Sequence, residues 1–266
     1  MMERLNLSII IVTYNCAAFI KEMLKELVSS LIDFLDYEIL IMDNNSSDDT
    51  HLLLQVYNRQ ASIFDSKSNL GFAKANNILI QKAKYDNILL LNPDVFGFSP
   101  TFWNNLFAEW DYINPMFIKL LNKDGSFQDC IGEVVSFQRI LSRFHGSSYG
   151  ELNKITEVGM GIMAFMITTK SSFKNVGLIS EDYYMYSEDM DWCYRAKLKG
   201  YKVLYDPKIH LTHIGGASAS TVWKISSTAL RKYQSERIFI RKYYHGLYKF
   251  SLLFINHIKS LLCKLR

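Results

Sequence analysis

A run of four large aliphatic residues at 88–91 constrains the fold more than any other stretch, because it stops at Asn92-Pro93-Asp94. Such a run, bounded by polar residues, is typical of a strand covered on both faces, as in a parallel sheet. Pro93 has no N–H to continue a strand ladder, so the strand should end there. Ligands of open α/β sheets bind beyond the carboxyl ends of the strands. Asp94 is therefore placed where a cation or polar ligand can bind, although a turn after a strand would also explain an aspartate.

The chain before this run alternates strand-like segments with segments of helical periodicity. Strands are expected at 5–12, 37–42, 62–64 and from 88, and helices at 19–31, 48–58 and 72–84. This alternation predicts a parallel sheet with right-handed crossovers, which places the strand-to-helix loops at one edge. The loops at 13–15, 43–47 and 92–94 should therefore meet there.

The regular alternation of strands and helices ends after Ser99-Pro100, which is a good N-cap and first-turn pair for a helix. The expected elements are a hairpin at 116–130, a strand at 158–168, short helices at 171–175 and 187–199, and short strands at 202–205 and 209–212. Residues 131–156 show no clear period, which predicts a variable loop.

Composition and charge limit the kinds of protein that this chain can be. With 49% hydrophobic and 21% charged residues, the chain is ordinary for a globular domain, and its net charge of +4 is too small to indicate a nucleic-acid partner. The four cysteines lie far apart without a CxxC pair, which favours reduced thiols in a cytoplasmic protein over disulfides or zinc ligands. We expect no signal peptide and no membrane span.

Several other polar groups each have a structural explanation. Asp43 would cap a helix, Asn69 and Asn76 would be turn and surface residues, and His213 would be a satisfied core histidine. The carboxylates of Glu188-Asp189 would be favoured at a helix N-terminus by the helix dipole.

These polar groups belong to motifs whose order along the chain is informative. The motifs are Ile10-Ile11-Val12-Thr13-Tyr14-Asn15; Asp43-Asn44-Asn45-Ser46-Ser47-Asp48; Asn69-x-Gly71-Phe72-Ala73-x-Ala75-Asn76-Asn77; Leu91-Asn92-Pro93-Asp94; Tyr184-Met185-Tyr186-Ser187-Glu188-Asp189-x-Asp191-x-Cys193-x-Arg195; and Gly200-Tyr201, Tyr205-x-Pro207 and His213-x-x-Gly216-x-Ser218. Taken together, they resemble the family 2 glycosyltransferases, and more narrowly the bacterial rhamnosyltransferase branch, over about residues 6–220.

The resemblance implies a GT-A fold, an α/β architecture with a mixed, mainly parallel sheet flanked by helices. It divides residues 1–220 into a nucleotide-binding half (1–98) and an acceptor and catalytic half (99–220). It also implies an inverting transfer from a nucleotide-sugar donor to an acceptor hydroxyl with a divalent cation, Mg²⁺ or Mn²⁺.

The same resemblance assigns roles to residues. Asp189 would be the catalytic base with Glu188 as a secondary catalytic candidate, Asp94 and His213 would be the metal ligands, and Asp43 would accept a hydrogen bond from the pyrimidine base. The residues expected to bind the nucleotide-sugar are Thr13, Tyr14, Asn15, Asp43, Asn45, Asn69, Gly71, Phe72, Asn76 and Asn92.

Two details qualify this assignment. Asn92 replaces the first carboxylate of the family's usual Asp-x-Asp, and Asn-Pro-Asp is common in the rhamnosyltransferase-like branch. On a helix, Glu188 and Asp191 share a face at i, i+3, whereas Asp189 points elsewhere. Asp191 and Arg195, at i, i+4, should form a structural ion pair.

After Ser218 the resemblance fades, and residues 221–266 become basic and helical. Seven apolar residues of the tail fall on one helical stripe, with Lys249, Asn256 and Lys259 opposite. The stripe consists of Leu247, Phe250, Phe254, Ile258, Leu261, Leu262 and Leu265. This helix either docks on the domain's own core or meets anionic lipid.

The sequence thus predicts a cytoplasmic glycosyltransferase, peripheral at the inner face of the cell membrane. We expect transfer of L-rhamnose from dTDP-rhamnose to a saccharide or polyprenyl-diphosphate-linked acceptor in bacterial surface polysaccharide (O-antigen, lipopolysaccharide) assembly. The alternatives are a UDP-sugar donor carrying N-acetylglucosamine or galactofuranose, or a non-catalytic sugar-nucleotide binder. A nucleotidyltransferase is disfavoured, because the first strand lacks a Gly-rich basic phosphate loop.

Overall fold

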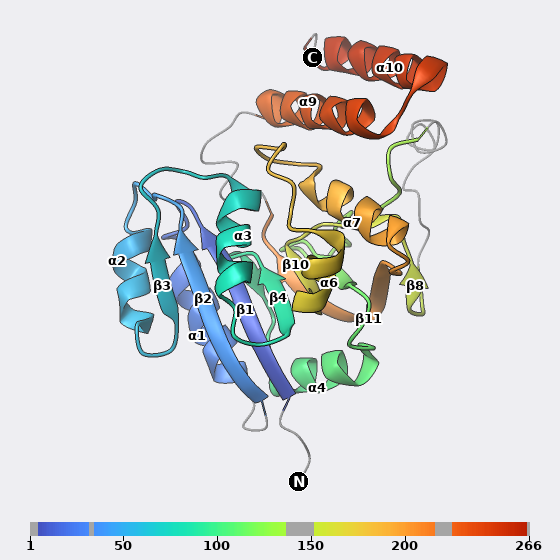
Figure 1. Ribbon diagram of the computed structural model, residues 1–266. Coiled ribbons are helices and arrows are strands. Elements are labelled where there is room, and N and C mark those ends of the chain that lie inside the picture. Colours follow the sequence, from blue (N-terminus) through green and yellow to red (C-terminus); the bar gives the residue numbers. More distant parts are fainter. Residues whose placement is uncertain (1–4, 32–34, 137–151, 216–224, 265–266) are drawn as a thin grey trace.

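The buried run at 88–91 is strand β4 (Asn87–Leu91), which lies inside a mixed sheet. The computed structural model describes residues 5–31, 35–136, 152–215 and 225–264. Within these residues, nine strands form one sheet in the order β3-β2-β1-β4-β10-β6-β11-β5, with β8 paired to β11. The expected mixed, mainly parallel α/β sheet flanked by helices is confirmed (Figure 1).

The first half of the sheet is parallel, because each strand returns through a helix on the way to the next. Its strands are β1 (Leu5–Thr13), β2 (Leu35–Asp43), β3 (Ser62–Asp65) and β4, and its helices are α1 (Ile20–Ser30), α2 (Thr50–Leu54) and α3 (Phe72–Lys82). A 3₁₀ turn, η1 (Gln55–Tyr57), replaces the end of the helix expected at 48–58. In Figure 1, α3 lies in front of the sheet and α1 behind it.

The register brings the strand ends to a common edge. Thr13 pairs with Asp43 across β1 and β2, and β4 adjoins β1 with Leu91 beside Ile11. The first two loops meet directly, because the amide of Asn15 donates to Ser46 Oγ at 3.0 Å.

The second half contains shorter elements. They are β5 (Val95–Phe96), α4 (Pro100–Glu109), β6 (Met116–Leu121), β7 (Ile131–Gly132), β8 (Thr156–Glu157), β9 (Met160–Gly161), β10 (Phe165–Thr169), α6 (Lys170–Val176), α7 (Glu188–Leu198) and β11 (Leu204–His213). Ser99 caps α4 as predicted, since its hydroxyl accepts a hydrogen bond from the amide of Phe102 at 3.1 Å. The second arm of the hairpin expected at 116–130 forms only one bridge to the first, between Leu121 and Phe127.

Three expectations about strands and loops need correction. The strand expected at 158–168 is two strands, because β9 pairs with β7 in a separate sheet and β10 joins the main one. A side chain at Gly161 would lie 2.3 Å from the ring of Phe117, so only glycine fits where the chain passes over that ring. The two strands expected at 202–212 are one strand, β11, with a register shift between Asp206 and His210 around Pro207. Of the loop expected at 131–156, residues 137–151 lie outside the described residues, and the ends contribute β7 and β8.

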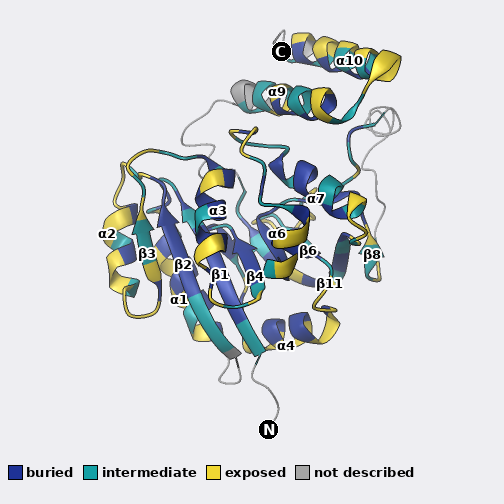
Figure 2. Cartoon of the chain, in the orientation of Figure 1, coloured by how far each residue is buried: buried dark blue, intermediate teal, exposed yellow. Residues whose placement is uncertain are grey.

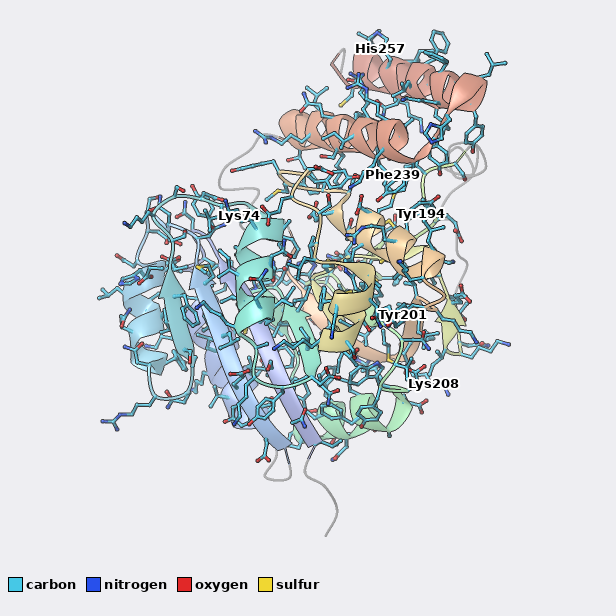
Figure 3. The ribbon with its side chains drawn as sticks, viewed as in Figure 1. Lys74, Tyr194, Tyr201, Lys208, Phe239 and His257 are labelled. Carbon is cyan, nitrogen blue, oxygen red and sulfur yellow. The ribbon has the colours of Figure 1, made fainter. Side chains whose placement is uncertain are left out.

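Two long helices complete the chain, α9 (Ile225–Tyr243) and α10 (Gly246–Lys264). Figure 1 shows them stacked beyond the edge of the sheet where β1 and β2 end, with α10 outermost. Phe239 of α9 faces Tyr194 of α7 with ring centroids 5.5 Å apart (Figure 3). Among the described helices, none is long and apolar enough to cross a membrane.

A fully buried carboxylate, Asp191, ties α9 to α7. Arg195 Nε lies 2.7 Å from one carboxylate oxygen, which confirms the predicted ion pair. The hydroxyls of Tyr183 and Tyr243 donate to the other oxygen at 3.0 and 2.8 Å, and Lys242 Nζ lies 3.1 Å from it. Burial of a charge is tolerated only with such compensation, so this cluster should be a main source of stability for the C-terminal half.

We predict that Asp191→Asn lowers the free energy of unfolding by about 3 kcal/mol, because it removes the buried charge that Arg195, Lys242 and two tyrosine hydroxyls compensate. Asp182→Asn is the matched control, since Asp182 pairs with the same Lys242 but is largely exposed. Its cost should stay below about 1 kcal/mol. Urea unfolding followed by circular dichroism measures both, and equal costs would contradict a special role for Asp191.

Candidate functional site

The residues expected at the end of β4 lie together in the structure. Strand β5 turns back and pairs with β11, which sets Val95 opposite His213. Asp94 Oδ1 consequently lies 3.2 Å from His213 Nε2, and Asn92 Nδ2 lies 3.5 Å from the same nitrogen. Asp94 and His213 are both buried. The structure thus brings the two predicted metal ligands side by side.

Gln128 fixes the orientation of the His213 ring. Its Nε2 donates to two oxygens, Asn122 Oδ1 at 3.1 Å and the His213 carbonyl at 3.2 Å, so its Oε1 is the atom facing His213 Nδ1 at 2.6 Å. That oxygen can only accept, so Nδ1 carries the proton and Nε2 of a neutral ring presents a lone pair to Asp94.

The His213 Nε2 atom and the Asp94 oxygen, 3.2 Å apart, are two atoms that one divalent cation can bind together. One imidazole nitrogen, one carboxylate and a second hydrogen bond that holds the imidazole are the parts of a divalent-cation site. The residues present therefore fit such a cation. Sequence motifs do not identify Gln128, which belongs to none of them and reaches His213 through the hairpin.

The donor side is built from the ends of β1 and β2. The Asp43 carboxylate is buried, and it accepts hydrogen bonds from Thr13 Oγ1 at 3.2 Å and Ser46 Oγ at 2.5 Å. Asn15 Oδ1 accepts from the amide of Ser47 at 2.8 Å. Asn15 and Asn45 adopt positive φ angles of 49° and 66°, which asparagine tolerates better than most residues. Tyr14 is half-buried and Asn45 is exposed beside this network.

Asn44 holds the second predicted donor segment, the loop before α3. Its Nδ2 donates to Asn69 Oδ1 at 3.0 Å, and its Oδ1 accepts from the amide of Leu70 at 2.8 Å. Gly71 has φ 80°, and a side chain there would lie 3.2 Å from the carbonyl oxygen of Tyr184. The loop therefore contacts the segment that leads to Glu188-Asp189. Asn44 belongs to a motif, yet sequence reasoning gave it no role.

The predicted donor residue Asn76 is buried, and its Nδ2 donates to the carbonyl of Phe72 one turn earlier at 2.9 Å. Its neighbour Asn77 instead links α3 to a distant segment, because its amide group bonds both the carbonyl and the N–H of Ile179. Asn76 thus shapes the first turn of α3, where Phe72 begins the helix.

The two predicted catalytic carboxylates lie in the first turn of α7 and differ in their surroundings. Tyr186 and Ser187 have positive φ angles of 72° and 68°, a strained pair that turns Glu188 inward. Glu188 Oε2 is buried without a hydrogen-bond partner among the described residues. Burial first, and the Asp189 carboxylate second, raise the pKa of Glu188 to about 8. Asp189 is partly exposed, and its Oδ1 accepts from the amide of Met190 at 2.7 Å.

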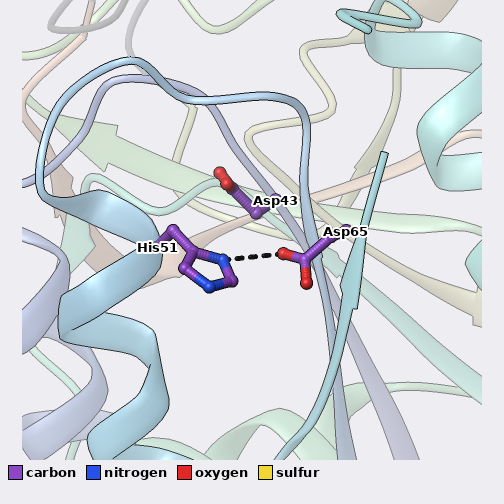
Figure 4. Close-up of side chains that lie close together, drawn as sticks. All are labelled: Asp43, His51 and Asp65. Atoms are coloured by element: carbon purple, nitrogen blue, oxygen red, sulfur yellow. Dashed lines mark hydrogen bonds and ion pairs between the residues drawn. The ribbon is translucent and has the colours of Figure 1, made fainter. Parts of the chain in front are cut away.

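A second group of side chains could also hold a cation. One ligand atom each from Asp43, His51 and Asp65 lies within 4.8 Å of the others, and His51 Nδ1 is 2.8 Å from Asp65 Oδ1 (Figure 4). Asp43 is already engaged by Thr13 and Ser46, and about half of the His51 and Asp65 side chains is exposed. Sequence reasoning missed this group because its members come from α2 and from the ends of β2 and β3.

We predict that Glu188→Gln removes a pH-dependent loss of stability. A carboxyl whose pKa rises from 4.5 to about 8 on folding contributes stability that is complete below pH 4.5 and is lost as the pH rises through about 8. Between these values the wild type should lose up to about 1.4 kcal/mol per pH unit relative to Glu188→Gln. Urea unfolding from pH 5 to 8.5 measures this slope. The control is Glu22→Gln, at an exposed position of α1, which should keep the pH dependence of the wild type. The same pH dependence in Glu188→Gln and Glu22→Gln would refute the assignment.

The chain is similar in sequence to known proteins. Residues 8–121 match the family model for glycosyl transferase family 2. The rhamnosyltransferase WbbL of Escherichia coli K12 is 29% identical over 226 residues, which cover 77% of this chain and 82% of that protein. The hexosyltransferase Agl10 of low-salt glycan biosynthesis in Haloferax volcanii is 25% identical over 203 residues, covering 72% of this chain and 62% of Agl10.

Solved structures share the fold. The mannosyltransferase PcManGT from Pyrobaculum calidifontis, in complex with GDP-Man and Mn²⁺, superposes with a TM-score of 0.63 at 14% identity, covering 98% of this chain and 70% of PcManGT. S. aureus TarS residues 1–349 superpose with a TM-score of 0.59 at 17% identity, covering 94% of this chain and 69% of that one. The sheet is thus the expected GT-A fold. The family-model match and the two curated relatives together support a glycosyltransferase of family 2.

Proposed function

We propose that the protein transfers L-rhamnose from dTDP-rhamnose to a saccharide acceptor in bacterial surface polysaccharide assembly. The observation that carries the proposal is the buried pair of Asp94 and His213, oriented by Gln128 at the carboxyl end of β4. Rhamnose is favoured by the likeness to a rhamnosyltransferase and by Asn92 in the strand-end motif. A UDP-sugar donor is the second candidate, because the poly-β-1,6-N-acetyl-D-glucosamine synthase of Staphylococcus epidermidis is 24% identical over 230 residues.

Residues 1–98 would hold the nucleotide. Asp43 would accept the N–H of a pyrimidine base, and the hydroxyls of Thr13 and Ser46 keep its carboxylate in place. The other residues of the donor site would be Tyr14, Asn15, Asn45, Asn69, Gly71, Phe72, Asn76 and Asn92.

Asp94 and His213 would hold a divalent cation, Mg²⁺ or Mn²⁺. When bound, it would neutralise the charge that develops on the departing nucleoside diphosphate. Gln128 would keep the unprotonated Nε2 of His213 directed at that position. Because the leaving group is already an anion, the protein needs no general acid.

Residues 99–220 would bind the acceptor and supply the base. The acceptor hydroxyl would give its proton to Asp189, which is partly exposed on the first turn of α7. Glu188 lies buried beside it with a raised pKa, so at neutral pH it would be a neutral group that positions Asp189. A polyprenyl-diphosphate-linked acceptor would place the enzyme at the cytoplasmic face of the cell membrane.

We predict that dTDP-rhamnose with Mn²⁺ raises the melting temperature more than UDP-sugars do, since a ligand at 100 times its Kd stabilises the folded state by about 2.7 kcal/mol. Asp94→Ala should abolish the Mn²⁺-dependent part. Gln128→Ala should weaken Mn²⁺ binding by about 10- to 100-fold, and His213→Ala by at least as much. Asp65→Asn, in the second candidate cation group, is the control that should change nothing. Full activity in EDTA would overturn the metal assignment, and a larger shift with a UDP-sugar would overturn the donor.

We predict that Asp189→Asn lowers turnover by about 10² to 10⁴ while donor affinity is unchanged, because the change removes only the ability to accept a proton. Glu188→Gln should cost less, since a neutral Glu188 already resembles glutamine in charge and shape. Single-turnover transfer and donor titration on both variants separate chemistry from binding. Near-normal turnover in Asp189→Asn with an inactive Glu188→Gln would move the role of base to Glu188.

A further inference from the structure

Helix α10 packs on α9 through a partly polar line of side chains. Leu252, Asn256 and Ser260 are buried and recur every four residues. Asn256 bonds two residues of α9, because its Oδ1 accepts from Arg237 Nε at 2.7 Å and its Nδ2 donates to Glu236 Oε2 at 3.1 Å. The side of α10 that meets the protein is therefore not its most apolar side.

The opposite side carries large apolar residues that are 40–86% exposed (Figure 2). This outer face of α10 consists of Leu247, Phe250, Phe254, Ile258 and Leu261. At 100° per residue, these five positions fall within an arc of about 80°, roughly opposite to Asn256. These five members of the predicted stripe are exposed, whereas α10 itself docks on α9 through its opposite side.

Charge indicates what covers this face. Residues 221–266 contain ten lysines and arginines and a single acidic residue, Glu236, whereas residues 1–220 contain 20 basic and 25 acidic residues. The small net charge of +4 hides this asymmetry. A second copy paired about a two-fold axis would bring two strongly positive segments together. An anionic bilayer instead matches the apolar face and the excess of positive charge in the segment that carries it.

We propose that the outer face of α10 docks on an anionic phospholipid bilayer. The proposal deepens the proposed function, because a lipid-linked acceptor would be presented in the same bilayer. Five exposed apolar side chains give the partition into the lipid interface, and the basic segment adds attraction to anionic headgroups within about 10 Å of the surface.

Helix α9 connects this face to the catalytic segment. Ser235 Oγ donates to the carbonyl of Met185 at 2.9 Å, and the guanidinium of Arg231 lies 5.8 Å from the centre of the Tyr184 ring. Tyr243 donates to Asp191 in α7. Docking of α10 therefore places residues 184–191 one helix layer away from the bilayer, on the side of the sheet where the acceptor would enter.

The test uses the full chain and sedimentation with vesicles of phosphatidylcholine, with and without phosphatidylglycerol. The protein should bind the anionic vesicles, more weakly as salt rises, and should bind pure phosphatidylcholine weakly. The double variant Phe250→Ser/Phe254→Ser should lower the affinity about 100-fold, since each buried phenylalanine contributes roughly tenfold or more. The matched control is Leu52→Ser/Val56→Ser, on α2 and η1, whose side chains are 68% and 66% exposed and should not matter.

Each outcome separates the alternatives. No binding of the wild type to anionic vesicles, or equal binding by the Phe250→Ser/Phe254→Ser variant, overturns the proposal. A wild-type dimer that this variant dissociates, seen by sedimentation velocity, assigns the face to a second copy. If the double variant fails to keep the wild-type melting temperature, Leu247→Gln at the most exposed position replaces it. Vesicle binding by a protein that turns over no donor would refute the proposed function and leave this inference intact.

Discussion

The carboxylate of Asp191 is the point on which the C-terminal half depends. It is fully buried and charged, and its partners come from α7, from the segment before α7 and from α9. A buried charge is stable only when its partners stay in place, so these three pieces cannot move independently. Asp189 lies half a turn earlier on α7. The position of the proposed base is consequently tied to the C-terminal helices as well as to the sheet.

The two sides of the site are built by different means. The proposed donor side rests on strand ends and on loops whose polar side chains bond one another, as Asp43 does with Thr13 and Ser46. The proposed acceptor side rests on the first turn of a helix, after two residues with positive φ. The first arrangement gives a network of hydrogen bonds between loops, and the second gives two adjacent carboxylates with different environments, one buried and one partly exposed.

Periodicity and the position of proline predicted the half of the sheet formed by β1 to β4, because each strand and loop there is determined by residues close together in the sequence. The motifs also predicted a common site for Asp94 and His213, whose side chains lie 3.2 Å apart. Gln128 was not, because its role depends on a hairpin that packs beside β11, far away in the sequence. The break in the strand expected at 158–168 depends on Phe117 covering Gly161. For α10, periodicity identified the apolar stripe. It could not say which face of α10 packs on the protein, since that depends on the side chains of α9.

The register shift in β11 decides which way His213 points. Side chains alternate between the two faces of a sheet along a strand. The irregularity between Asp206 and His210 therefore decides which face of the sheet each later side chain of β11 lies on, including that of His213 beside Asp94. Loss of one residue there would leave the strand pairing with β6 available yet turn the imidazole to the opposite face. This stretch of β11 should therefore tolerate changes of side chain more readily than changes of length.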